Sequence, residues 1–269
     1  MKAILVDARE DPGFERRVDA ALRLRSVFDG HLTCLHATPY DAFILGDPFG
    51  GVYALPTIIE DVRAAEERHR LSAEERLKHD TSSWTWVQEN GQPIQQLIEH
   101  SRLADIVVLS LPVEEGRADP AMSQLAQVSL YAQSPVLAVP CARSAFDPAG
   151  VALVAWNGSA EAAHTIRFIR PLLEKASAVH IVTVNKDDMG WPASGAAAYL
   201  ARYGIGAELH DWAGDGQDVA DTLFRGAATL RPAYIAMGAY GHSRFREMML
   251  GGVTRALLLR SAIPLILSH

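Results

Sequence analysis

The chain of 269 residues has little of several features that would each assign it to a definite class of protein. It has two cysteines, Cys34 and Cys141, each within an apolar run, so neither a disulfide framework nor a cysteine zinc site is expected. We predict both to be reduced and buried. No apolar run approaches the ~20 residues of a membrane span, and the opening MKAILVDARED becomes acidic too early for a signal peptide. The sequence therefore predicts a cytoplasmic protein without a membrane partner.

Positive charge is also scarce, with 25 Lys and Arg against 32 Asp and Glu and a formal net charge of -7. Proteins that bind nucleic acid or anionic lipid without sequence preference need a basic surface, so we expect neither partner. The chain lacks the G-x-x-x-x-G-K-[ST] and G-x-S-x-G motifs, and its ten histidines show no sequence spacing typical of a metal site. No nucleophile has a matched base. We therefore predict no catalytic residue and no metal ligand.

The sequence contains an internal repeat of one structural unit. A short apolar run at 3–7, a helical stretch at 14–28 and a second apolar run at 31–37 recur in the same order from residue 150. Both halves also end on a proline-led apolar run, SPVLAVP and AIPLILSH. Each half is expected to run β-α-β-α-β-α-β, and buried apolar strands alternating with helices predict a parallel sheet.

These patterns predict an α/β protein with two tandem doubly wound domains, 1–143 and 150–269, each built on its own separate sheet. Strands are expected to start near Ala3 and Val151, with a junction near 141–150. The halves differ at 40–59, a loop rich in proline, glycine and aromatic residues, which precedes a charged helix at 60–80 that we expect to face solvent.

Two loops of the second half carry the residues best suited to phosphate. In open α/β sheets, ligands lie beyond the carboxyl ends of the strands, where loops lead into helix N-termini. One loop is AWNGSAE, with Asn157 and Ser159; the other, 237–258, has four glycines and leads into a helix from about Val253. Glycines allow a close approach of the backbone, and free N–H groups attract phosphate. The first half has one glycine at 109–127 and the pair Glu114 and Glu115, so it is expected to bind no anion.

The spacing Gly238-x2-Gly241-x9-Gly251, followed by a helix and a proline-containing strand, resembles the universal stress protein family. The resemblance covers 150–269 closely and 1–140 by the order of elements, which makes the first domain a degenerate copy. It implies the UspA fold, of the adenine-nucleotide-hydrolase-like class, and a non-enzymatic cytoplasmic protein of the stress response that binds ATP, ADP or AMP in its second domain. The site that the resemblance and the loops imply consists of Asn157, Ser159, Val184, Gly238, Gly241, Gly251, Gly252 and Val253.

Two departures from the family pattern concern metal and catalysis. Asn157 stands where the family usually has aspartate, which disfavours Mg²⁺, because magnesium prefers carboxylate and phosphate oxygens. Gly252 stands where the family has serine or threonine, so a hydroxyl donor is lost while the backbone N–H stays. Both changes predict phosphate binding without ATP turnover.

Other interpretations are open at this stage. The glycines fit a simple strand-to-helix connection, Ser159 fits a helix N-cap, and Asn157 fits a turn. His242, Arg244 and Arg246 fit solvent-facing residues. An ATP-using enzyme of the adenylyl-transfer or ATP-pyrophosphatase folds is one alternative function. A module that binds a small apolar ligand through Phe43, Phe49 and Tyr53 is another. Both pairing of the halves within one chain and pairing in a homodimer fit the sequence.

Overall fold

The computed structural model describes residues 1–46, 52–54, 56–80, 83–112, 120–141, 146–184, 190–214, 218–239 and 252–269. Of residues 42–46, 52–54, 56, 80, 120 and 121 it describes the backbone only. Within these ranges, no helix is long and apolar enough to span a bilayer.

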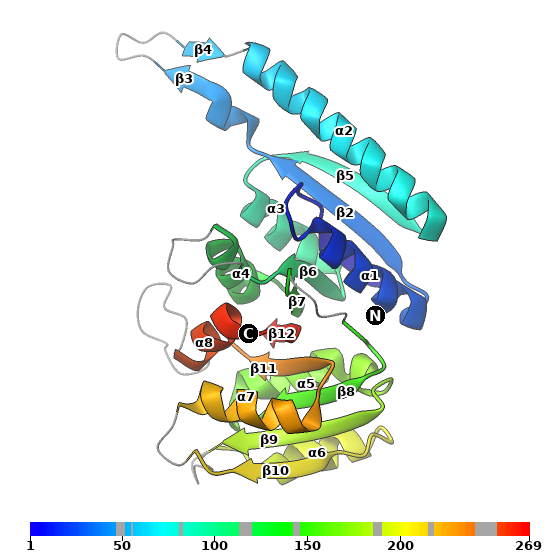
Figure 1. Cartoon of the computed structure of the whole chain (residues 1–269), viewed down its shortest axis with the longest axis vertical. Helices are drawn as coiled ribbons and strands as arrows, with labels where there is room; N and C mark the ends of the chain where they lie inside the picture. The colour runs from blue at the N-terminus through cyan, green and yellow to red at the C-terminus, as the bar shows by residue number, and fades with distance from the viewer. Residues whose placement is uncertain are drawn as a thin grey trace.

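The first half alternates strands and helices as far as a short connection to the second half (Figure 1). Its elements are β1 (Ala3–Asp7), α1 (Phe14–Phe28), β2 (His31–Thr38), α2 (Pro56–Asp80), β5 (Trp84–Asn90), α3 (Pro93–His100), β6 (Ile106–Ser110), α4 (Pro120–Tyr131) and β7 (Val136–Val139). Short 3₁₀ helices occupy Tyr40–Phe43 and Ser101–Leu103, and β3 (Ile44–Gly46) pairs with β4 (Val52–Ala54) in a separate two-stranded sheet.

The second half repeats this order without the hairpin. Its elements are β8 (Val151–Ala155), α5 (Ala160–Leu173), β9 (Ala178–Val184), α6 (Ala193–Ala201), β10 (Glu208–Trp212), α7 (Val219–Leu230), β11 (Tyr234–Gly238), α8 (Gly252–Arg260) and β12 (Leu265–Ser268). The predicted strand starts at Ala3 and Val151 are confirmed. The limits 1–143 and 150–269 of two independent domains stay a prediction.

The prediction of two separate sheets is wrong, because all ten strands of the two halves form one sheet. Its order is β10-β9-β8-β11-β12-β7-β6-β1-β2-β5, which places equivalent strands symmetrically about the centre. Every pairing in this sheet is parallel except the central one, where β12 and β7 run antiparallel with Ile266 opposite Leu137. The two proline-led terminal strands thus pair with each other within the chain. Each of these strands is the edge of its own half and is apolar and buried, and the pairing of β7 with β12 keeps both edges from solvent.

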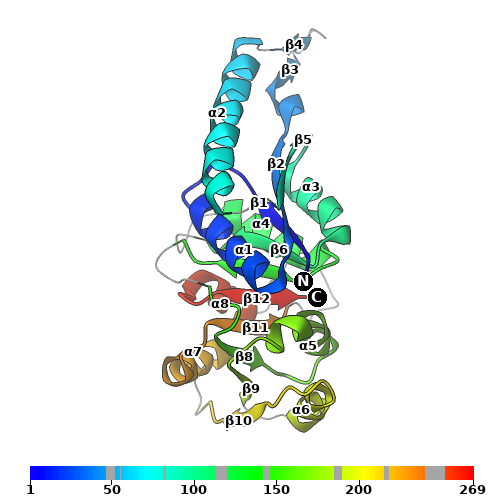
Figure 2. The ribbon, with the colours of Figure 1, turned by 90° about the vertical axis from the view of Figure 1, so that its right-hand side faces the viewer.

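Helices cover both faces of the sheet, and one hydrophobic core runs along each face through both halves. In β1, Ile4 and Val6 point into one core and Leu5 into the other, as the two-residue period of a strand requires. Helices α1, α2, α5 and α6 pack on the first core, and α3, α4, α7 and α8 on the second. A twist of about 20–25° per strand turns the sheet along its length, so α1 and α5 share a face yet lie on opposite sides in Figure 2.

Each half contributes to the ten-stranded sheet one strand more than the sequence predicts, and the first half also has the hairpin β3–β4. The additional strands are β5 and β10, which form the two edges of the sheet. Their burial alternates, and they carry polar residues such as Gln88, Glu89, Glu208 and His210 in place of a continuous apolar run. An edge strand has one neighbour and is partly solvated, so it does not need the apolar pattern of a central strand.

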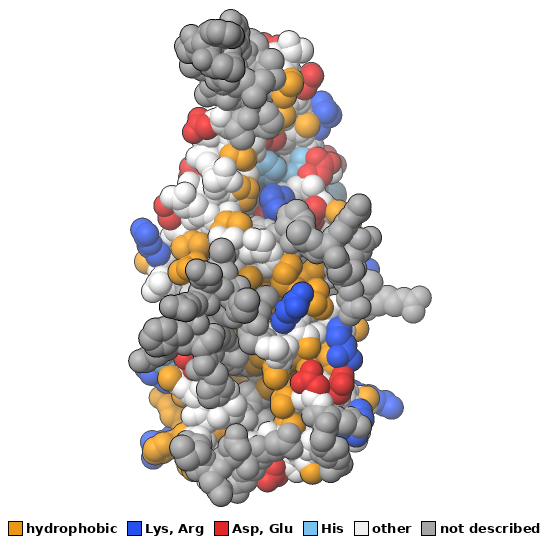
Figure 3. All heavy atoms as spheres, turned by 90° about the vertical axis from the view of Figure 1, so that its left-hand side faces the viewer, with side chains coloured by type: hydrophobic (Ala, Val, Ile, Leu, Met, Phe, Trp, Pro, Cys, Tyr) orange, Lys and Arg blue, Asp and Glu red, His pale blue; other side chains and the backbone are white. Residues whose placement is uncertain are grey.

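Helix α2 begins at Pro56, earlier than the predicted residue 60, and extends beyond the body of the molecule together with the β3–β4 hairpin (Figure 1). Its C-terminal part is anchored, since Ala73 and Leu77 are buried in the first core. Phe49 and the side chains of Phe43 and Tyr53 lie outside the described residues. On the described part of the face in Figure 3, basic and acidic side chains are interspersed.

Candidate functional site

The sheet has two topological switch points, one in each half, where successive crossovers leave a strand in opposite directions. In the second half the switch point lies between β8 and β11, because β9 and β10 lie on one side of β8 and β11 lies on the other. The first half repeats this order, with its switch point between β1 and β6. Such points open a crevice at the carboxyl ends of the strands, which is where ligands bind in open α/β sheets. The two crevices are occupied very differently.

The β8–α5 turn of the second half is a short polar loop. The backbone N–H of Ser159 donates to Oδ1 of Asn157 at 3.1 Å, and Gly158 between them has a φ of +73°, which favours glycine. The Oγ of Ser159 accepts from the N–H of Ala162 at 3.2 Å, so Ser159 is the N-cap of α5. The turn and N-cap interpretations of Asn157 and Ser159 are therefore what the structure shows.

Gly238 ends β11 directly against this turn. A Cβ at this position would lie 2.5 Å from the backbone nitrogen of Ala162 and 2.7 Å from the backbone carbon of Glu161. Only glycine allows β11 and the first turn of α5 to approach this closely. The structure thus brings Gly238 against the first turn of α5, which Ser159 caps, across the switch point and far apart in the sequence.

The remaining predicted residues are described in part. Val184 is the last residue of β9, half-buried and opposite Trp212 of β10. Helix α8 begins at Gly252, one residue before the predicted Val253. Gly241, Gly251, His242, Arg244 and Arg246 lie outside the described residues.

Two tryptophans form one wall beside the β8–α5 turn. The N–H of Trp191 donates to the carbonyl of Gly158 at 3.2 Å, and Nε1 of Trp156 donates to the carbonyl of Trp191 at 2.8 Å. Together with Ile166, Ala196 and Tyr199 they line an apolar cleft of about 170 Å³ between α5 and α6. Ligand pockets for small molecules are usually ~300 Å³ or more, so this cleft is smaller than a usual nucleotide pocket.

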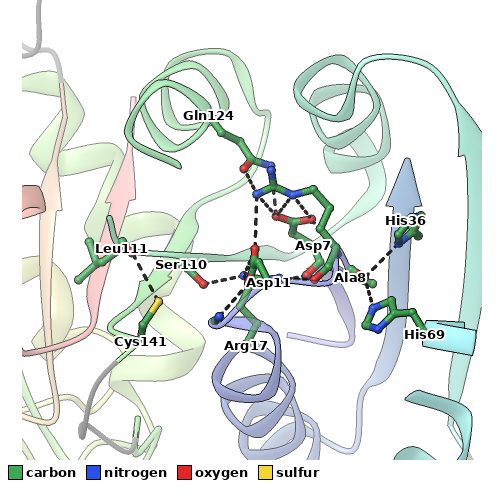
Figure 4. A network of polar contacts seen from close by, with 12 residues as sticks. Asp7, Ala8, Asp11, Arg17, His36, His69, Ser110, Leu111, Gln124 and Cys141 are labelled. Carbon is green, nitrogen blue, oxygen red and sulfur yellow. Dashed lines mark hydrogen bonds and ion pairs between the residues drawn. The ribbon is translucent and has the colours of Figure 1, made fainter. Parts of the chain in front are cut away.

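The first switch point is filled by the chain's own side chains (Figure 4). Asp7, the last residue of β1, is 2% exposed. The guanidinium of Arg9 donates to its carboxylate from Nε at 3.1 and 3.0 Å and from Nη2 at 2.9 Å. Gln124 of α4 donates to Asp7 at 3.2 Å and accepts from Arg9. A buried charge is tolerated only when it is paired in this way.

Arg17 of α1 closes the same crevice from below and is fully buried. Its guanidinium donates to the carbonyls of Asp7 at 2.6 Å and Arg9 at 2.9 Å, to the carboxylate of Asp11 at 2.8 and 3.0 Å, and to Ser110 at 2.7 Å. Asp7, Arg9, Asp11 and Arg17 thus form an internal ion network across the carboxyl ends of β1 and β6. The absence of anion binding in the first half stays a prediction. The sequence-based reason for this prediction was the pair Glu114 and Glu115, which lies outside the described residues. The ion network is a second, independent reason to expect no anion binding there.

A histidine cluster lies beside this network. Nε2 of His69 and Nδ1 of His36 lie 2.8 and 3.2 Å from the carbonyl oxygen of Ala8, and both imidazoles are buried. Since a carbonyl only accepts, both nitrogens carry a hydrogen. The carboxylate of Glu66 lies 3.6 Å from Nε2 of His36 and accepts from Tyr40, and burial, together with this carboxylate, raises the pKa of the Tyr40 hydroxyl. This cluster fastens α2 to β2.

Sequence analysis missed both the ion network and a second group of histidines. The segment Asp7-x-Arg9-x-Asp11 directly after a strand was the available signal for the network. On the far edge of the sheet, His180 of β9 lies beside Glu208 and His210 of β10. His180 is far in sequence from Glu208 and His210, and parallel pairing of β9 with β10 brings the three together, so no short spacing motif could reveal this group.

Three solved structures that share this fold are 14–16% identical to the chain in sequence. A universal stress protein from Archaeoglobus fulgidus DSM 4304 aligns with a TM-score of 0.70 and 16% identity, over 99% of this chain and 95% of that one. The chain has the universal stress protein fold. A putative universal stress protein from Pseudomonas aeruginosa UCBPP-PA14 gives a TM-score of 0.55 at 14% identity, over 99% and 91% of the two chains. No protein-family model and no curated protein matches the chain.

A protein described as functionally unknown, from Pseudomonas aeruginosa PAO1, has a TM-score of 0.57 at 14% identity, over 100% of this chain and 92% of that one. In all three cases the similarity extends over both halves. The mostly parallel sheet and the helices that alternate with its strands therefore form the universal stress protein fold. The ligand has to be argued from the residues of this chain.

Proposed function

We propose that the chain is a non-enzymatic stress-response protein of the cytoplasm that binds an adenine nucleotide at the switch point of its second half. The observation that carries the proposal is the contrast between the two switch points. The first is filled by Arg9, Arg17 and Gln124, whereas the second ends in the glycines Gly158 and Gly238 and small polar residues.

Phosphate binding at the second switch point is supported by the helix that starts there. The N-terminus of α5 carries a partial positive charge from its aligned peptide dipoles. Oδ1 of Asn157 is used within the turn, and no described residue accepts from its amide nitrogen, which can donate to a phosphate oxygen. At Gly252, the first residue of α8, a Cβ would meet no atom of the described residues within 4 Å.

The same residues support binding without turnover. Phosphoryl transfer needs a positioned metal and compensation of the charge on the transferring oxygens. Asn157 offers a neutral oxygen that already accepts from Ser159, and Gly252 has no hydroxyl. Losing these groups costs transition-state stabilisation more than ground-state binding, because backbone N–H contacts to phosphate remain. Binding without hydrolysis suits a protein that reports nucleotide level.

Calorimetric titration with ATP of the wild type and of Gly252→Glu tests the binding site. The glutamate adds a like charge beside the phosphates without a steric conflict, and two like charges ~5 Å apart repel by about 3 kcal/mol at an effective dielectric of 20. We expect at least a tenfold loss of affinity, since ~1.4 kcal/mol is tenfold. Gly206→Glu is the matched control, because a Cβ at Gly206 also meets nothing within 4 Å and Gly206 precedes β10, at the amino ends of the strands.

Unchanged affinity in Gly252→Glu, or ATP binding by neither protein, would remove the proposed site. The enzyme alternative is tested by ATP hydrolysis with and without Mg²⁺, in the wild type and in Asn157→Asp with Gly252→Ser. We expect the wild type at background and metal-dependent binding improved in the double variant. Turnover near the ~1–10³ s⁻¹ of ordinary enzymes, lost in Gly252→Glu, would make the chain an ATP-using enzyme.

A further inference from the structure

Two imidazoles and a carboxylate converge on the outer edge of the second half. One ligand atom from each of His180, Glu208 and His210 lies within 4.8 Å of the other two. Nδ1 of His180 is 2.9 Å from Nε2 of His210 and 3.4 Å from Oε2 of Glu208. The three residues come from the neighbouring strands β9 and β10, so the backbone of the sheet fixes their spacing.

The strand register explains why these side chains share one face. His180 pairs with Glu208 in the parallel ladder, and His210 is two residues further along β10. A strand alternates its side chains between faces with a period of two, so Glu208 and His210 lie on the same side as His180. Trp212 follows on this face with its ring centroid 6.0 Å from that of His210, and its indole packs against Gly226 of α7.

The two separations of 2.9 and 3.4 Å lie on either side of the distance between ligands of a tetrahedral zinc ion, and the shorter one is a hydrogen bond between the two imidazoles that the ion would replace. Bonds of ~2.0–2.1 Å that meet at the tetrahedral angle place ligand atoms about 3.3 Å apart. Two histidines and one carboxylate are a ligand set that Zn²⁺ accepts, with a fourth position left for water. The side chain of His180 is 12% exposed and that of Glu208 68% exposed, so the site is preformed on one side and reachable from solvent on the other.

We propose that His180, Glu208 and His210 bind one Zn²⁺ ion, or a late first-row divalent ion of similar chemistry. The ion links the edge strand β10 to β9. Strand β10 is the least protected strand of this half, because it has one neighbouring strand and is exposed to solvent. Each imidazole donates the lone pair of the nitrogen that faces the ion, and protons compete for that lone pair. The site lies toward the amino ends of β9 and β10, so it is separate from the proposed nucleotide site at the carboxyl ends.

Calorimetric titration of the full chain, freed of any affinity tag and treated with a chelator, uses Zn²⁺ alone as the probe. We expect one ion per chain near neutral pH and a much lower affinity near pH 5, because metal binding releases protons. His210→Gln is expected to raise the Kd at least ~100-fold, since the loss of an outer-sphere partner alone costs up to ~100-fold. Glu208→Gln is a milder variant at an exposed position, and His164→Gln, an exposed histidine of α5, is the matched control.

Replacement by Co²⁺ identifies the ligands by spectroscopy. A tetrahedral site of nitrogen and oxygen ligands gives visible d–d absorption without the near-ultraviolet band of a cobalt–thiolate bond. Retention of both the stoichiometry and the visible absorption in His210→Gln and Glu208→Gln would overturn the proposal. So would a thiolate band that disappears in Cys141→Ser, since it would place the ion at the half-buried Cys141. Unchanged circular dichroism of the variants separates loss of a ligand from loss of the fold.

Discussion

At the scale of single residues, the first half is held together by a charge that has no contact with water. Arg17 is 0% exposed, and its guanidinium has carbonyl, carboxylate and hydroxyl acceptors on three sides. A buried charge with every donor satisfied is tolerated, whereas removal of one partner leaves the others desolvated and unpaired. This arginine is therefore a structural residue at a position where the fold family offers a ligand crevice.

Arg17→Met is expected to lower the free energy of unfolding by about 2–4 kcal/mol, because the carbonyls of Asp7 and Arg9 lose their donors. Urea unfolding measures the change. Arg16→Met on the same helix is the control, since Arg16 is exposed and its ion pair with Asp19 is long, at 3.9 Å. We expect about 0.5 kcal/mol or less for it. Equal losses in the two variants would contradict the structural role of Arg17.

Cys34 gives the chain a pH dependence at alkaline pH. Burial raises the pKa of the Cys34 thiol from 9.0 to about 12. The folded chain holds this proton more tightly than the unfolded chain, so the stability is fully present below about pH 9 and is lost as pH rises toward 12. The loss is up to ~1.4 kcal/mol per pH unit. Urea unfolding at about pH 8 and about pH 10.5 measures it.

The control for this pH effect is Cys34→Ala, in which the alkaline decline should become shallower. Equal slopes in the wild type and in Cys34→Ala would show that the thiol does not contribute. The sequence predicted two buried cysteines. Cys34 is buried as predicted, and Cys141 is half-buried with its Sγ 3.8 Å from the carbonyl of Leu111, so the prediction is wrong for Cys141.

At the scale of elements, burial decides which strands could be predicted. The central strands are apolar on both faces, as in Ile106–Ser110 and Leu265–Ser268, and their runs are visible in the sequence. The edge strands β5 and β10 alternate between exposed and half-buried residues and escaped notice. The proposed zinc ligands were missed for the same reason, since two of them lie on β10.

Helix α2 combines a face buried in the first core with a face exposed to solvent. Leu77 is 0% exposed in the first core, whereas Leu71 is 51% exposed on the same helix. We expect Leu77→Ala to cost ~2–5 kcal/mol of stability through lost burial and a cavity. Leu71→Ala should change it by about 0.5 kcal/mol or less. Thermal or urea unfolding compares the pair, and a larger loss in Leu71→Ala would contradict the way α2 is seated.

At the scale of the whole molecule, the sequence revealed the repeat but not how its copies join. Pairing of β7 with β12 depends on two apolar strands separated by nearly half of the chain, and no local pattern specifies it. The candidate site could be predicted in part. Gly238 lies against the first turn of α5, which Ser159 caps, because carboxyl ends of parallel strands share one edge, and the binding role of these residues stays a prediction. The filling of the other switch point depends on side chains that only the folded chain brings together.

The central claim is that a nucleotide binds in one half only. Hydrogen exchange of the full chain, with and without saturating ATP, tests it most directly, because both switch points report in one measurement. We predict slower exchange in peptides that cover 156–162 and 236–254, and unchanged exchange at 7–13 and 108–112. Slower exchange in the first half, or no change in either half at an ATP concentration that saturates the calorimetric titration, would contradict the account.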